Sequence, residues 1–84
     1  MRTKERVLEI LETAFLPLAC KAELHKDEIG FRVDGPNGDV LWRQPKAPAS
    51  KYMVGPTLEQ VVKDARAQLE DEGHELGPWS MPAD

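Results

Sequence analysis

The one cysteine of this 84-residue chain, Cys20, is the first residue to test for chemistry. A catalytic thiol needs exposure and a neighbouring base that lowers its pKa. Cys20 alternates in phase with Ala22 and Leu24, which predicts a strand side chain that points into a core. His25 lies five residues further on and therefore points to the opposite face of that strand. We interpret Cys20 as a small buried packing residue.

Groups that could bind a metal or a cofactor are scattered along the chain. A metal site takes three or four convergent ligands, and Cys20, His25 and His74 lack such spacing. The glycine-containing run at 35–38 lies between predicted strands, so it lacks the helix N-terminus that holds a phosphate. Most acidic residues fall in rows on the polar sides of predicted helices. We therefore predict no metal, no cofactor and no catalytic residue, and we expect that the protein is not an enzyme.

Two features are typical of contact surfaces. Three acids at 70–72 lie at the negative end of a predicted helix, as either a frayed, solvated end or a patch that faces a basic partner. Trp79 follows in a tail with glycine and proline, where it either anchors a partner or folds back onto the domain. We predict the fold-back, because a small core gains from burying an indole. The candidate partner contacts are Trp79, Met81, Glu70, Asp71, Glu72, Arg32 and Arg43.

A helix within residues 55–73 is the clearest element that positions these residues. Its apolar stripe recurs at helical spacing and consists of Leu58, Val61, Val62, Ala65 and Leu69. Thr57 is the expected N-cap, with Gln60 completing a capping box, and Gly73 is the expected left-handed stop. A second amphipathic helix is expected over 3–16, closed by Pro17.

Three antiparallel strands are predicted between these helices, over 18–25, 29–34 and 40–43. Turns at 26–28 and 34–39 join them, the second because Asn37-Gly38 tolerates positive φ. In the third strand we assign Val40 and Trp42 to the inward face. The stretch 44–51 is predicted to be a connector, and a short fourth edge strand at 52–54 is left open. The open face of the sheet is expected to carry Lys21, Glu23, His25, Arg32, Asp34 and Arg43.

This order of elements predicts an α+β, two-layer fold, with both helices on one face of the sheet. Residues 1–73 are expected to form a single domain and 74–84 a tail. The net charge of −4 and the lone cysteine suit a cytoplasmic protein. The longest apolar-rich stretch, 7–18, is too short and too charged to span a membrane.

The run Ala14-Phe15-Leu16-Pro17-Leu18-Ala19-Cys20 resembles a small bacterial single-domain family that is catalogued as domain of unknown function 1652. That family has no established activity, so the resemblance implies no site residue. Residues 55–69 are similar to the closing helix of the antitoxin family that partners small RNA-cleaving toxins. The helix–three strands–helix layout is also that of the double-stranded RNA-binding domain.

These features favour a small regulatory or adaptor module that acts by protein contact, through an unknown partner or self-association. The alternative is a nucleic-acid-associated regulator, with the antitoxin-like or double-stranded-RNA-binding-like layout. The predicted last helix opens Thr57-Leu58-Glu59-Gln60, without the basic cluster that RNA contact requires, so we expect no useful affinity for nucleic acid. An enzyme of unknown type is the third reading.

Overall fold

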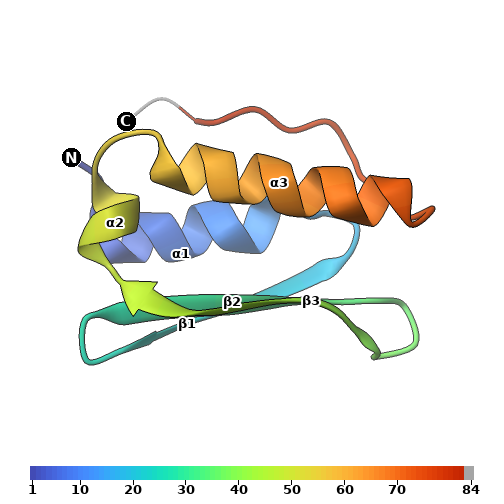
Figure 1. Cartoon of the computed structure of the whole chain (residues 1–84), viewed down its shortest axis with the longest axis horizontal. Coiled ribbons are helices and arrows are strands. Elements are labelled where there is room, and N and C mark those ends of the chain that lie inside the picture. The colour runs from blue at the N-terminus through green and yellow to red at the C-terminus, as the bar shows by residue number, and fades with distance from the viewer. Residues whose placement is uncertain (83–84) are drawn as a thin grey trace.

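The computed structural model describes residues 1–82 and consists of a helical layer on a three-stranded antiparallel sheet (Figure 1). Along the chain the elements are α1 (Lys4–Thr13), β1 (Ala19–His25), β2 (Glu28–Asp34), β3 (Val40–Pro48), α2 (Ser50–Met53) and α3 (Thr57–Asp71). The helices lie on one side of the sheet and leave its other side open. The α+β class and the placement of both long helices on one face, expected from the order of elements, are confirmed.

The sheet is a meander of two hairpins with strand order β1-β2-β3. Lys26 and Asp27 close the first hairpin with φ angles of 49° and 63°, the left-handed values that a two-residue turn requires. In the second turn Gly38 has a φ of 84°, and the Gly35 N–H donates to the Asp39 carbonyl at 2.8 Å. Both predicted turns are therefore present.

β3 is longer than the sequence suggested. The predicted connector is wrong for 44–48, because Gln44 pairs with Phe31 and Ala47 with Ile29. The prolines are compatible with this pairing, since an edge strand can turn positions without an N–H toward solvent. The fourth strand left open at 52–54 is not formed, because 50–53 make the single turn of α2.

Of the two residues predicted to face inward from β3, one does so. Trp42 pairs with the buried Val33 and packs against the core. Val40 is 45% exposed, so its inward assignment is wrong. The register shifts between Val33 and Asp34, which inserts Leu41 as an extra residue and turns Val40 away from the helices.

The observed helix ends differ from the predicted ones in two details. The α1 helix ends at Thr13, three residues before the predicted end, because a turn in which the Leu18 N–H donates to the Phe15 carbonyl follows it. In α3, Thr57 is the first helical residue rather than the cap, because the Pro56 carbonyl already accepts from the Gln60 N–H at 3.0 Å. The capping box is therefore wrong, and the Gln60 side chain donates to Asp64 instead.

The predicted stop of α3 is confirmed. Gly73 has a φ of 95°, the Gly73 N–H donates to the Glu70 carbonyl, and the His74 N–H donates to the Leu69 carbonyl, both at 3.0 Å. These two bonds are the Schellman motif, which satisfies carbonyls that the helix end would otherwise leave unpaired.

A single core lies between the helices and the sheet. Phe15, just after α1, meets Phe31 of β2 with ring centroids 5.7 Å apart. The fully buried large side chains are Val7, Ile10, Leu11, Phe15, Ile29, Val33, Leu58, Val62 and Leu69. The apolar stripes predicted for both helices therefore form the core, except that Leu8 and Val61 are only partly buried.

The C-terminal segment lies back along the helical layer (Figure 1). Trp79 and Met81 are partly buried against the core, which confirms the predicted fold-back of Trp79. The Arg66 guanidinium fastens this segment, because it donates to the Ala14 carbonyl at 2.6 Å and to the Gly77 carbonyl at 2.5 Å. Residues 83–84 of the predicted tail lie outside the described residues.

Candidate functional site

The open face of the sheet carries a row of cations across all three strands. Lys21 pairs with Arg32 across β1 and β2, and Arg32 pairs with Arg43 across β2 and β3. Residues directly opposite each other in an antiparallel pair project from the same face, and neighbouring strands lie about 4.8 Å apart. The candidate contacts Arg32 and Arg43 are therefore neighbours, although eleven positions separate them in the sequence.

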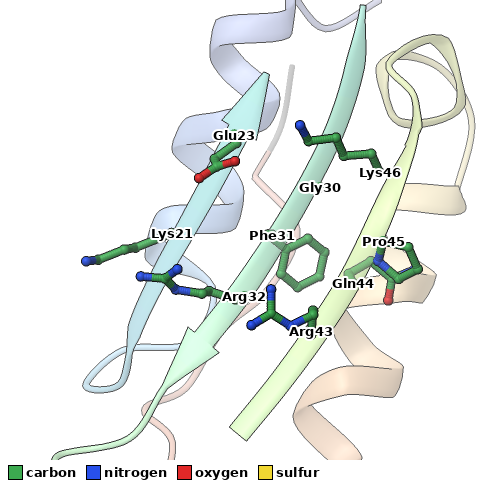
Figure 2. Close-up of a pocket in the computed structure, with 9 residues that line it drawn as sticks. All are labelled: Lys21, Glu23, Gly30, Phe31, Arg32, Arg43, Gln44, Pro45 and Lys46. Carbon is green, nitrogen blue, oxygen red and sulfur yellow. The ribbon is translucent and has the colours of Figure 1, made fainter. Parts of the chain in front are cut away.

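Lys46 joins this row from the same edge strand. Figure 2 shows its side chain reaching from β3 over Gly30 of β2, on the side of the sheet where Arg43 and Arg32 lie. We call the surface formed by Lys21, Arg32, Arg43 and Lys46 the basic face. These residues, with Glu23 and Gly30, line a hollow of about 210 Å³.

Gly30 makes room for this hollow. A Cβ atom at this position would lie 2.9 Å from the Lys46 Cγ and 3.1 Å from both the Gln44 carbonyl oxygen and the Lys46 nitrogen. β3 bulges at this point, because its register to β2 shifts between Ile29 and Phe31. The missing side chain lets the bulged strand approach β2 and lets the Lys46 chain cross it.

The charge of the hollow is opposite to that of the whole chain. Its lining has four cations and one carboxylate, Glu23, whereas the chain has a net charge of −4. One further carboxylate, on Asp34, approaches Arg32 with an Oδ1–Nε distance of 3.3 Å. Like charges directly opposite each other on neighbouring strands destabilise a sheet. A bound anion would therefore relieve repulsion along the row.

The chemistry of the basic face selects ligands that accept hydrogen bonds. Lysine and arginine side chains are donors without acceptor atoms, and carboxylate and phosphate oxygens are their usual partners. Phe31 also lines the hollow, but it is only 4% exposed and its ring packs against Phe15 on the helix-covered side, where Trp42 also packs against the core. The face thus offers charge and hydrogen bonds, but its strands supply no ring on which a base could stack.

The other candidate contacts lie elsewhere. Glu70, Asp71 and Glu72 are exposed at the end of α3, in the helical layer and away from the basic face. Trp79 and Met81 are taken up by contacts within the chain. The structure therefore brings together the two arginines of the predicted set and separates them from its acidic and aromatic members.

Cys20 is buried at 8% exposure, as its alternation predicted. Burial raises the pKa of its thiol to about 12, with smaller contributions from the negative charges of Glu12 and Asp34. A thiol with this pKa is protonated at neutral pH and is a poor nucleophile.

Burial also raises the pKa of Tyr52, an effect that a hydrogen bond with the Gln44 side chain partly offsets.

Within residues 1–82, no group of three or more His, Cys, Asp or Glu side chains lies close enough to hold a metal ion. Over the same residues, no helix has the length and apolar character needed to cross a membrane.

Lys46 and Gly30 are the members of the site that sequence reasoning missed. Assigning 44–51 to a connector removed Lys46 from the sheet, and Gly30 lies inside a six-residue strand pattern that does not by itself indicate a hollow. Two signals were available, because prolines in an extended stretch are typical of an edge strand, and a glycine inside a strand often marks a bulge or a close approach.

Comparisons with protein-family models, with curated proteins and with solved structures found no match for this chain. The resemblance of residues 14–20 to domain of unknown function 1652 therefore stays a prediction.

Proposed function

We propose that this protein is a small binding module without enzymatic activity, and that its basic face receives an acidic segment of a partner protein. The observation that carries the proposal is the row Lys21–Arg32–Arg43, extended by Lys46, in a chain that is acidic as a whole. Complementary charge of this kind speeds association and selects partners. A cytoplasmic setting is part of the proposal, and the free, buried Cys20 is consistent with it.

Nucleic acid is the second candidate, and the same cations favour it, because they could neutralise phosphates. Two observations support the protein partner instead. Single-strand binding uses aromatic platforms, and Phe31 and Trp42 project toward the helices. The row also spans only three strands, or about 10 Å, which is short for tracking a nucleic-acid backbone.

Titration of labelled acidic peptide tests the proposal. A ten-residue peptide of alternating glutamate and serine should bind the full chain at about 0.05 M salt and bind more weakly at about 0.15 M. The matched probes are the same peptide with glutamine for glutamate and a single-stranded RNA of equal length. We expect the acidic peptide to bind most tightly and the glutamine peptide not to bind.

Paired charge variants locate the binding. Arg43→Gln with Lys46→Gln removes two cations from the basic face, and Lys51→Gln with Lys63→Gln removes two from the helical layer, leaving equal net charge. We expect the first pair to weaken peptide binding about five- to thirtyfold, from about 1–2 kcal/mol of lost contacts. The second pair should bind like the unmodified chain. Equal weakening by both pairs would overturn the proposal, and tighter binding of RNA than of peptide would promote the second candidate.

A further inference from the structure

The two edges of the sheet differ in what they offer to another strand. On β3 the edge holds Pro45 and Pro48 and is interrupted by two register shifts, features that block strand addition. On the other side, β1 spans seven residues without proline and pairs with β2 in unbroken register. Within residues 1–82, the outer edge of β1 has no strand beside it. An open, regular edge of this kind is a template for pairing with another chain.

The hairpin defines which backbone groups of β1 are available. His25 and Glu28 are the last pair before the two-residue loop at 26–27. Such a loop is closed by a hydrogen-bonded pair, and bonded and non-bonded pairs alternate along an antiparallel ladder. The residues that turn their N–H and C=O groups toward the free edge are therefore Cys20, Ala22 and Leu24.

We propose that β1 pairs with β1 of a second copy of this chain, antiparallel and centred on Ala22, so that two sheets join into one of six strands. In this register Lys21 lies opposite the partner subunit's Glu23, and Glu23 lies opposite the partner subunit's Lys21. Cys20 lies opposite the partner subunit's Leu24 on the helix-covered side. The strand is thus complementary to itself in charge on one face and in apolar character on the other.

The charges specify this register against its neighbours. A shift of two residues in either direction places Lys21 opposite the partner subunit's Lys21, or Glu23 opposite the partner subunit's Glu23, and like charges opposite each other are destabilising. A shift of one residue would mix the two faces of the sheet. In the proposed register Leu24, which is 38% exposed at this edge, gains the partner subunit's Cys20 as an apolar neighbour.

The pairing does not depend on the acidic-partner proposal. It would place the two basic faces side by side and occupy Lys21 and Glu23, leaving Arg32, Arg43 and Lys46 available to a ligand. Strand pairing over seven residues buries less surface than a typical stable complex, so we expect a dimer that forms at micromolar concentrations or above.

Sedimentation equilibrium of the full chain at about 5–500 µM tests the pairing, because a dimer with a small interface is expected to dissociate in this concentration range. The unmodified chain should change from monomer to dimer within it. Lys21→Glu should weaken the dimer about tenfold or more by placing carboxylates opposite carboxylates, and Glu23→Lys should do the same with cations. Both side chains are exposed, so both variants should keep the melting temperature of the parent chain.

Mixing the two variants gives the decisive measurement. A Lys21→Glu chain beside a Glu23→Lys chain has opposite charges at both facing positions, so the mixture should form a heterodimer that is tighter than the homodimer of either variant. The double variant Lys21→Glu, Glu23→Lys should dimerise like the parent. A parent chain that stays monomeric throughout the range would overturn the proposal, leaving the edge to a strand of another protein. A dimer that ignores both single charge changes would overturn it as well.

Discussion

On the helix-covered side of the sheet, Cys20, Phe31 and Trp42 contact apolar residues of the helices and their flanking segments, and on the other side the adjacent Lys21, Arg32 and Arg43 contact solvent. The same three strands carry both sets, because successive side chains point to opposite faces. The first face stabilises the fold by burial. The second gathers like charges that weaken the sheet slightly and that a ligand could use. Burial and the proposed recognition thus fall on alternate residues of the same strands.

The largest expected effect comes from the covered face. Leu69→Ala and Phe15→Ala should each lower the free energy of unfolding by about 2–5 kcal/mol, because both side chains are fully buried and leave a cavity. Urea denaturation followed by circular dichroism measures the change. Arg43→Ala on the open face is the control and should stay within about 0.5 kcal/mol of the parent. Equal losses in the three variants would break the contrast between the faces.

Truncation after Glu75 extends the comparison to the far side of the helical layer. It removes Trp79 and Met81, which pack against the core, and breaks the Arg66 bond to the Gly77 carbonyl. We expect a loss of about 1–3 kcal/mol, since buried apolar area outweighs the entropy of ordering the segment. Thermal denaturation provides the measurement. In the untruncated chain, Trp42→Phe leaves Trp79 as the sole tryptophan. A fluorescence emission maximum typical of a fully hydrated indole in that variant would contradict the docking.

Gly30→Ala sharpens the comparison at one point of the open face where packing is tight. The added methyl group meets the Lys46 side chain and two backbone atoms of β3, so we expect a loss of about 1–2 kcal/mol. Combining it with Lys46→Ala should recover only part of this loss, because the backbone contacts persist. Full recovery in the double variant would show that β3 does not approach β2 as closely as described.

Cys20 provides the smallest effect and reports on the covered face through pH. Its folded-state pKa of about 12 exceeds the unfolded value of 9.0, so the folded chain holds the proton more tightly. The stability linked to this proton is present below pH 9 and is lost as the pH rises from 9 toward 12. Unfolding free energies at pH 8 and pH 10 should differ more in the parent than in Cys20→Ala. Rapid alkylation of the folded thiol at pH 8 would contradict its burial.

Much of this architecture could be predicted, and the misses have physical causes. The helices, the hairpins and the glycine stop depend on periodicity and on local φ preferences, which adjacent residues determine. The extension of β3 to Pro48 depends on pairing with Phe31 and Ile29, partners far along the chain. Thr57 has the chemistry of a cap, but the path of the chain through Pro56 begins the helix one residue earlier.

The sequence by itself determined most of the side chains that would be buried on each helix, that Cys20 would point inward, and that Arg32 and Arg43 would lie on the exposed face. These outcomes depend on spacing within one element, which the linear order specifies. Only the tertiary structure decided that β3 bulges beside Gly30, that Lys46 joins the basic face, and that β1 has the open edge. The first two depend on the register between strands and the third on strand order, and both are set by how distant segments pack and not by the order of neighbouring residues.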